Sequence, residues 1–167
     1  MIHIYYGFGR GKTSTLNGTA LRGLSAGKEV EYFRFLKGRP TGEDQQLEKL
    51  GIKVRYFHHT DKFVMWMSPE EKQETRRKVL EGLNAISASK ADLILIDEGI
   101  DLIETGLATE DELILALQNP YRNNADILIS GHYVLKDLFN LAGLITHFEA
   151  EKHYYDEGVK AKEGIEF

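Results

Sequence analysis

A short glycine-rich run near the N-terminus constrains the fold more than any other part of the sequence. Residues 1–6 (MIHIYY) have the apolar and aromatic character of a strand, and they lead directly into residues 7–13 (GFGRGKT). Glycines permit a tight turn that presents backbone N–H groups to a polyphosphate, while the lysine adds a positive charge and the threonine a hydroxyl suited to Mg²⁺. The segment therefore predicts a phosphate-binding loop between a strand and a helix.

The spacing within this loop is unusual. The common pattern has four residues between its first glycine and the Gly-Lys pair, whereas here only Phe8, Gly9 and Arg10 intervene. The loop is a shortened variant, or Tyr6 fills the first position. A glycine-rich turn followed by a chance lysine is the alternative, but the strand before the loop and the helix after it are the context that the motif requires.

The rest of the chain alternates between strand and helix patterns. Strands are predicted at 29–35, 53–57, 93–96, 127–129 and 144–148, and helices at 12–26, 43–50, 68–89, 109–117 and 134–142. Two capping boxes begin the third and fourth of these helices, and Asn119-Pro120 is expected to close the fourth. Together with the loop, this alternation predicts a single α/β domain over residues 1–167. We expect a phosphate-loop NTPase-like (RecA-like), mostly parallel sheet with helices on both faces.

Composition narrows the class of protein further. The chain has no cysteine, which excludes a disulfide framework, a thiolate zinc site and a cysteine nucleophile. Its net charge of −5 argues against a general nucleic-acid binder, because such proteins need clustered Lys and Arg. No run approaches the ~18 apolar residues of a membrane span, and the N-terminus lacks the pattern of a signal peptide. We expect a soluble, cytoplasmic protein with a small anionic ligand and with neither nucleic acid nor membrane as a partner.

An acidic pair follows the apolar run at residues 93–96, which has the character of a central parallel strand. Asp97 and Glu98 can hold Mg²⁺ directly or through water if they lie near the phosphate loop. Because adjacent residues on a strand point to opposite faces, only one of the two is expected to ligate the metal directly. Taken alone, the pair is equally well explained as an acidic turn after a core strand.

Two other segments are candidates for ligand contact. Residues 37–43 are rich in turn formers and follow a strand, at the sheet edge where open α/β sheets bind ligands. Residues 63–67 (FVMWM) concentrate large apolar side chains and the only tryptophan just before a helix start. This cluster is either an ordinary core element or the wall of an apolar pocket. The six histidines show no metal-ligand spacing, and no serine stands in a nucleophile-elbow pattern.

Several segments, taken together, resemble the phosphate-loop branch of the ATP:corrinoid adenosyltransferases of the bacterial cobalamin pathway. Residues 7–13 look like that family's Gly-Asn-Gly-Lys-Gly-Lys-Thr loop, including its short spacing. Residues 35–38, with Gly42 and Glu43, are similar to its Phe-Ile-Lys-Gly segment and following Gly-Glu, and residues 95–98 to its acidic strand end. The tail at 152–167 resembles its Lys-His-x-x-Asp-x-Gly-x-x-Ala-x-x-Gly-Ile ending, the most specific of these signals.

The chain also departs from the family pattern at three places. It begins at the first strand, where many members carry an additional helix. The family's Thr-Gly-Arg after the late core strand is Ser130-Gly131-His132 here. The Phe-x-Trp that flanks the corrin ring in the family appears as FVMW at 63–66, so that Trp66 is displaced by one position or Met65 takes its place.

The resemblance implies transfer of the 5′-deoxyadenosyl group of ATP to the Co(I) centre of a corrinoid, cob(I)yrinic acid a,c-diamide or cob(I)alamin, with release of triphosphate. A reductase that supplies electrons and a second copy of the chain, forming a homodimer, are the implied partners. The implied ATP contacts are Gly7, Phe8, Gly9, Arg10, Gly11, Lys12, Thr13 and Ser14, with Lys12 and Thr13 serving catalysis. The implied Mg²⁺ residues are Thr13, Glu98 and Asp97, with Glu98 as the direct ligand, and the implied corrinoid contacts are Phe63 and Trp66.

Two alternatives stay open at this point. A kinase or NTPase acting on the γ-phosphate needs a water-positioning residue or base and commonly an arginine, for which Arg10 and Arg39 are the candidates. Thymidine kinases are a neighbouring case, although the missing cysteines remove the zinc site that many of them have. The other alternative is a nucleotide- or corrinoid-binding protein without transferase activity.

Overall fold

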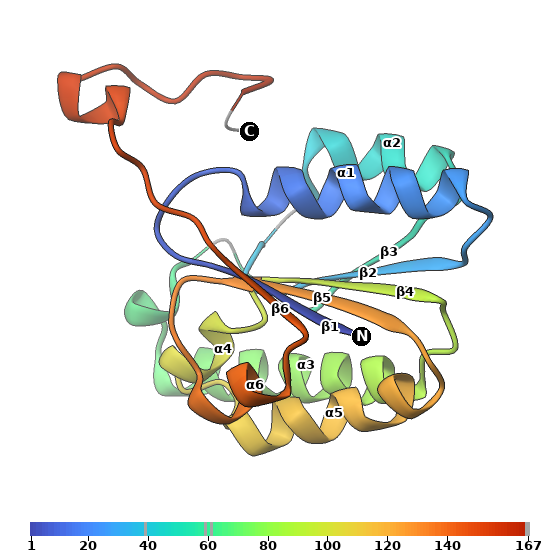
Figure 1. Ribbon diagram of the computed structural model, residues 1–167. Helices are drawn as coiled ribbons and strands as arrows, with labels where there is room; N and C mark the ends of the chain where they lie inside the picture. The colour runs from blue at the N-terminus through green and yellow to red at the C-terminus, as the bar shows by residue number, and fades with distance from the viewer. Residues whose placement is uncertain (39, 59, 61, 166–167) are drawn as a thin grey trace.

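One six-stranded parallel sheet forms the centre of the computed structural model, which describes residues 1–38, 40–58, 60 and 62–165 apart from the side chain of Asp156 (Figure 1). The strand order is β3-β2-β4-β5-β1-β6. The strands are β1 (Ile2–Tyr6), β2 (Val30–Arg34), β3 (Lys53–Tyr56), β4 (Leu93–Asp97), β5 (Asp126–Gly131) and β6 (Leu144–His147). One strand, β5, thus separates the strand before the glycine loop from the strand that ends in the acidic pair.

Helices cover both faces of this sheet. On one face lie α1 (Lys12–Ser25) and α2 (Gly42–Lys49), and on the other α3 (Pro69–Ala88), α4 (Asp101–Glu104), α5 (Glu110–Arg122) and α6 (Lys136–Leu141). Two 3₁₀ turns, η1 (Val64–Trp66) and η2 (Tyr154–Glu157), complete the secondary structure. The predicted α/β fold with helices on both faces is confirmed. No helix within the described residues is long and apolar enough to cross a bilayer.

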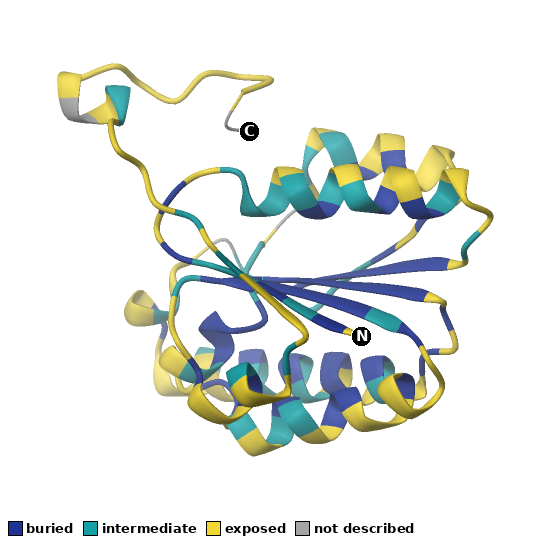
Figure 2. Ribbon diagram, viewed as in Figure 1, coloured by how far each residue is buried: buried dark blue, intermediate teal, exposed yellow. Residues whose placement is uncertain are grey.

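Alternation along the strands builds two cores, one on each side of the sheet (Figure 2). Ile4, Ile96 and Ile129 belong to the core beneath α3 and α5. Leu95 and Leu128 point the other way, into the core beneath α1. Because the central strands are buried on both sides, their sequences read as continuous apolar runs.

Two expectations about individual elements were wrong, and one element was missed. Helix α5 does not stop before Pro120 but continues to Arg122, because Pro120 is buried and Asn123 N still bonds to Asn119 O at 3.1 Å in the last turn. The strand expected in the core at residues 144–148 is the edge strand β6, with Leu144 and Ile145 exposed. The short helix α4 was not predicted, since its four residues are too few to show a helical period.

Candidate active site

The glycine loop joins β1 to α1 at the carboxyl end of the sheet, in the predicted strand–loop–helix setting. Gly7 and Gly11 have φ angles of 111° and 106°, a left-handed region that favours glycine. Lys12 folds back over the loop, where its Nζ donates to Gly7 O at 2.6 Å and to Gly9 O at 3.0 Å. Burial lowers the pKa of Lys12. The lysine is therefore already held at the mouth of the loop.

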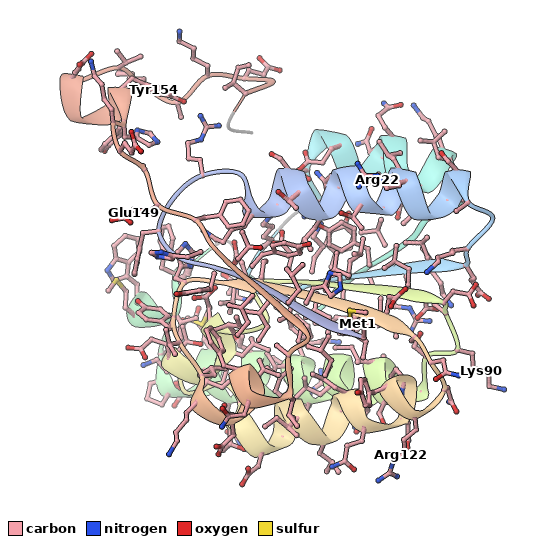
Figure 3. All side chains as sticks on the ribbon, in the orientation of Figure 1. Met1, Arg22, Lys90, Arg122, Glu149 and Tyr154 are labelled. Carbon is pink, nitrogen blue, oxygen red and sulfur yellow. The ribbon has the colours of Figure 1, made fainter. Side chains whose placement is uncertain are left out.

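The C-terminal tail crosses this loop. Gly9 N donates to Phe148 O at 2.8 Å, and a Cβ at Gly9 would come within 2.6 Å of Glu149 N. Figure 3 shows Glu149 where the chain leaves the sheet and Tyr154 further along the tail. Arg10 binds that tail through Tyr154 Oη at 2.7 Å and Ile165 O at 2.7 Å. Gly9 and Arg10, predicted as nucleotide contacts, thus also serve to hold the tail.

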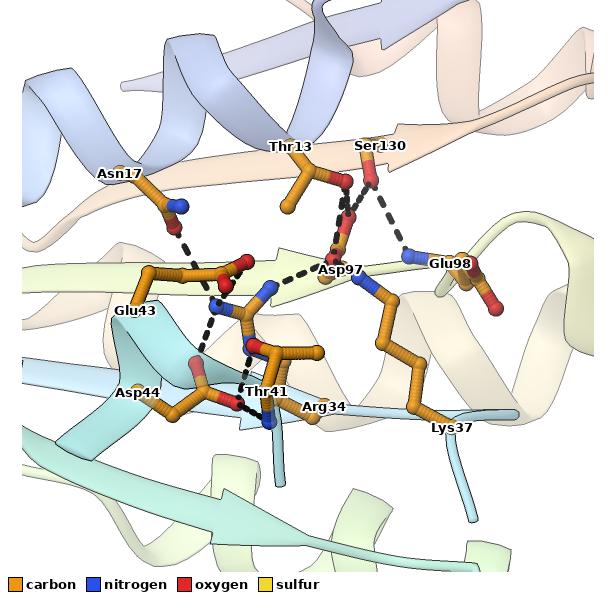
Figure 4. A network of polar contacts seen from close by, with 10 residues as sticks. All are labelled: Thr13, Asn17, Arg34, Lys37, Thr41, Glu43, Asp44, Asp97, Glu98 and Ser130. Atoms are coloured by element: carbon orange, nitrogen blue, oxygen red, sulfur yellow. Dashed lines mark hydrogen bonds and ion pairs between the residues drawn. The ribbon is translucent and has the colours of Figure 1, made fainter. Parts of the chain in front are cut away.

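Thr13 and Asp97 come together at the start of α1 and the end of β4 (Figure 4). The Thr13 hydroxyl donates to both carboxylate oxygens of Asp97, at 3.2 Å each, and Ser130 Oγ donates to Oδ1 at 2.6 Å. Arg34 and Lys37 bind Oδ2 at 2.7 and 2.6 Å. Burial alone would raise the pKa of Asp97, but Lys37 and Arg34 outweigh it and lower that pKa. Asp97 is thus an ionised carboxylate, and both of its oxygens accept hydrogen bonds.

Arg34 connects this carboxylate to helix α2. Its fully buried guanidinium also bonds to the carboxylate of Asp44 and, at 3.3 Å, to Asn17 Oδ1. Asp44 in turn accepts hydrogen bonds from the N–H and the hydroxyl of Thr41 at 3.0 and 2.9 Å. These bonds form the capping box at the start of α2. The sequence analysis assigned no role to Arg34 or Asp44. The available signal was an arginine at the carboxyl end of strand 30–34, since an arginine buried at that place requires carboxylate partners.

Glu98 diverges from Asp97, as expected, but through a turn and not through alternation along the strand, because β4 ends at Asp97. Its φ of 58° turns the chain, and its N–H donates to Ser130 Oγ at 3.0 Å. Burial, together with the neighbouring charge of Asp97, raises the pKa of Glu98 to about 7. The side chain faces a cavity instead of the Thr13 hydroxyl. Its role as a metal ligand stays a prediction.

That cavity has a volume of about 470 Å³, within the range of small-molecule sites. Phe63 and Met65 line it and are 67% and 76% exposed, so the interpretation of residues 63–67 as ordinary core is wrong for these side chains. Trp66 packs edge-on against Phe63, with ring centroids 5.1 Å apart, but does not itself line the cavity. Of the two residues that the sequence left as alternatives, Met65 is the one that reaches the cavity.

Phe8 connects the cavity to the phosphate loop. Its backbone belongs to the loop, whereas its ring lies 5.2 Å from the ring of His132 and 5.6 Å from that of Tyr133, and all three side chains line the cavity. His132 is held by Asp101, whose Oδ1 lies 3.1 Å from both its backbone N and its Nδ1. The anion-binding loop and an apolar cavity therefore share one wall. Arg39, a candidate for the γ-phosphate, and the last two residues of the tail lie outside the described residues.

A comparison with known protein families identifies this arrangement. The model of the family described as ATP:corrinoid adenosyltransferase BtuR/CobO/CobP matches residues 1–167, the whole chain. The chain belongs to the ATP:corrinoid adenosyltransferase family. It is 30% identical to the corrinoid adenosyltransferase of Escherichia coli K12 over 171 aligned residues, which cover 100% of the chain and 85% of that protein. It is 28% identical to the corrinoid adenosyltransferase CobA of Salmonella typhimurium, with the same coverage.

A solved structure supports the fold assignment alone. A KaiC-like protein from Pyrococcus horikoshii OT3 superimposes with a TM-score of 0.50 at 14% identity, over 90% of the chain and 74% of that protein. Membership of the ATP:corrinoid adenosyltransferase family makes this chain an adenosyltransferase with ATP and a corrinoid as its substrates. The general alternative of a γ-phosphate kinase is thereby set aside.

Proposed function

We propose that this adenosyltransferase moves the 5′-deoxyadenosyl group of MgATP to a Co(I) corrinoid held in the cavity beside the loop, and releases triphosphate. The observation that carries the proposal is the position of Phe8. Its backbone is part of the phosphate loop, and its ring lines the apolar cavity. ATP in the loop and the planar corrin ring in the cavity would then be neighbours. Under this proposal the corrinoid is cob(I)yrinic acid a,c-diamide or cob(I)alamin.

The reaction requires positioning and charge stabilisation from the protein instead of a base. The cobalt electron pair forms the bond to C5′, the C5′–O5′ bond breaks, and triphosphate leaves with that bond's electrons. Lys12 can exchange its bonds to Gly7 O and Gly9 O for bonds to the departing triphosphate. Because it acts on the leaving group, it stabilises charge that develops in the transition state.

Thr13 and the acidic pair fit a Mg²⁺ ion by the chemistry of their donors. The Thr13 hydroxyl donates its hydrogen bond to Asp97, which leaves the lone pairs of its oxygen free to bind a cation. Asp97 stays paired with the buried Arg34, so Glu98, whose side chain would turn from the cavity toward Thr13, is the carboxylate proposed to bind the ion directly. Among the described residues no cluster of three or more His, Cys, Asp or Glu surrounds a metal position, and Mg²⁺ typically takes remaining ligands from water and phosphate. When bound, the ion neutralises charge on the phosphates.

Glu98→Gln is expected to raise the Mg²⁺ concentration needed for half-maximal transfer more than Asp97→Asn does. The reason is that Glu98 supplies a direct ligand, whereas Asp97 acts through the Thr13 hydroxyl. The measurement is transfer rate against Mg²⁺ concentration at saturating ATP, with thermal unfolding of each variant as a check of folding. Glu104→Gln, at another carboxylate of the cavity, is the control. A larger effect of Asp97→Asn would exchange the two roles.

The apolar wall has a separate role in the proposal. A donor on the lower face of cobalt stabilises Co(II), and an aromatic side chain that occupies this space and excludes water makes reduction to Co(I) easier. Phe63, with Trp66 packed edge-on against it, supplies such a surface. The chain has no cysteine, so it has no dithiol that could supply the electron for reduction of Co(II) to Co(I). A separate reductase is therefore part of the proposal. A homodimer, implied by the family resemblance, also belongs to it.

Phe63→Ala and Trp66→Ala are each expected to keep bound Co(II) corrinoid in its ligated form, with little change in ATP affinity. Electron paramagnetic resonance of the Co(II) complex with ATP, together with transfer rates under a weak reductant, measures this. Tyr121→Ala, at an exposed aromatic on α5, is the matched control. Spectra and rates like those of the unmodified protein in both variants would contradict the assigned wall.

One assay tests the whole proposal. The protein is incubated with MgATP and chemically reduced corrinoid, and the products are analysed for a light-sensitive cobalt–carbon bond and for the phosphate released. Adenosylated corrinoid with triphosphate is the expected result. Formation of ADP would point to γ-phosphate chemistry, and the absence of turnover to a binding protein.

A further inference from the structure

Two cations meet on one oxygen of Asp97, and they are held very differently. Arg34 is fully buried and is fixed from behind by Asp44 and Asn17. Lys37 reaches the same oxygen at 2.6 Å from a loop, and its side chain is 20% exposed. Its ammonium donates a hydrogen bond to Asp97, and its charge also acts on Glu98. Of the two cations, Lys37 is therefore the one that can move away while Asp97 keeps a buried partner, Arg34.

The position of Lys37 brings it into competition with a divalent ion. The Asp97 oxygen that it binds also accepts the Thr13 hydroxyl at 3.2 Å. A divalent cation bound by the Thr13 hydroxyl would therefore lie close to the Lys37 ammonium. Two neighbouring positive charges repel each other strongly in a partly buried site. Arg34 and Lys37 face three carboxylates, Asp97, Asp44 and the partly exposed Glu43, so repulsion by the divalent ion, and not a surplus of positive charge, would drive Lys37 from Asp97 toward the phosphates.

The backbone before Lys37 is bent in a way that aims both neighbours at the site. Leu36 has a φ of 56°, a left-handed conformation that is unfavourable for a residue with a side chain. The bend directs Lys37 back across the strand end to Asp97, while Leu36 lines the cavity. Strain of this kind persists where surrounding contacts impose it, and it clusters at functional sites.

We propose that Lys37 is a second triphosphate-binding lysine, which neutralises Asp97 in the empty enzyme and transfers to the phosphates when MgATP binds. The inference rests on the proposed function only in taking the phosphate chain of MgATP to lie in the loop. A lysine suits the task because its flexible stem carries a compact charge from one anion to another. With Lys12, which starts from its own loop carbonyls, two ammonium groups would then act on the leaving triphosphate.

Binding of inorganic tripolyphosphate tests this without any corrinoid. Calorimetry with Mg²⁺ present would compare the unmodified protein with Lys37→Met, Lys37→Arg and Lys53→Met. Lys53 is the matched control because it also binds a buried carboxylate, Glu31 at 2.9 Å, but at the first residue of β3. Lys37→Met is expected to weaken tripolyphosphate binding by about 10- to 100-fold, the scale of a lost charged hydrogen bond. Lys37→Arg should recover part of that loss, and Lys53→Met should bind normally.

Two results would overturn the assignment. If Lys37→Met binds tripolyphosphate as the unmodified protein does, Lys37 only neutralises Asp97. If the loss in Lys37→Met is matched by a lower unfolding temperature and by an equal loss in Lys53→Met, the effect is general destabilisation. Failure of the proposed function is a different outcome, because a protein that binds tripolyphosphate through Lys37 but forms no cobalt–carbon bond would reject adenosyl transfer and leave this inference standing.

Discussion

Lys12→Ala is expected to lower the rate of adenosyl transfer by about 10²-fold or more, the scale on which a single preorganised donor to a developing negative charge contributes. Lys12 is already oriented at the loop mouth by Gly7 O and Gly9 O, so little reorganisation is needed when the phosphates arrive. The measurement is the rate of formation of the cobalt–carbon bond at saturating ATP and reduced corrinoid.

Lys28→Ala provides the control for that experiment. Lys28 lies just beyond the other end of α1 and binds Asp126 at 2.7 Å, so its removal takes away a lysine and an ion pair without touching the loop. Its rate should stay close to that of the unmodified protein. Normal turnover in Lys12→Ala would contradict the role assigned to the loop.

Arg34→Met is expected to lower the free energy of unfolding by about 3–5 kcal/mol, because it leaves the carboxylates of Asp97 and Asp44 buried without their common partner. Native domains are stabilised by only about 5–15 kcal/mol in total, so the effect would be a large part of the whole. Urea unfolding without nucleotide measures it.

Arg77→Met is the matched control for Arg34. Arg77 also binds two carboxylates, Glu74 and Glu81, but on the exposed surface of α3, where water and salt screen such pairs, so its removal should change the stability little. A similar loss of stability in the two variants would show that the buried network around Arg34 is not special. An unchanged stability in Arg34→Met would show that Asp97 and Asp44 find other partners.

The order of elements could be predicted because the signals are local. The apolar run at 93–96 and the capping boxes at Ser68 and Thr109 each depend on a few neighbouring residues, and the structure confirms both caps. Which strands lie side by side is not local information. The insertion of β5 between β1 and β4 depends on packing across the whole sheet, and no pattern within one strand carries it.

The site follows the same division. The loop and the acidic pair carry their chemistry in consecutive residues, so sequence patterns find them. Arg34 does not, because its partners Asp97 and Asp44 are 63 and 10 residues away in the chain. When its distant partners are not known, an arginine in a strand suggests that the strand lies at an exposed edge of the sheet. Phe8 was predicted as a nucleotide contact from its place in the loop, but the direction of its ring depends on His132 and Tyr133 from a distant strand end.

The double position of Phe8 has a thermodynamic consequence. A nucleotide that orders the loop backbone also restricts the ring that faces the cavity, and a ligand pressing on that ring restricts the backbone. Coupling between two binding sites is reciprocal, so the factor by which ATP changes corrinoid affinity equals the factor by which the corrinoid changes ATP affinity. With the corrinoid in this cavity, as proposed, the entropy lost in fixing the segment around Phe8 would be shared between the two ligands, and the ligand that binds second would find the segment already ordered.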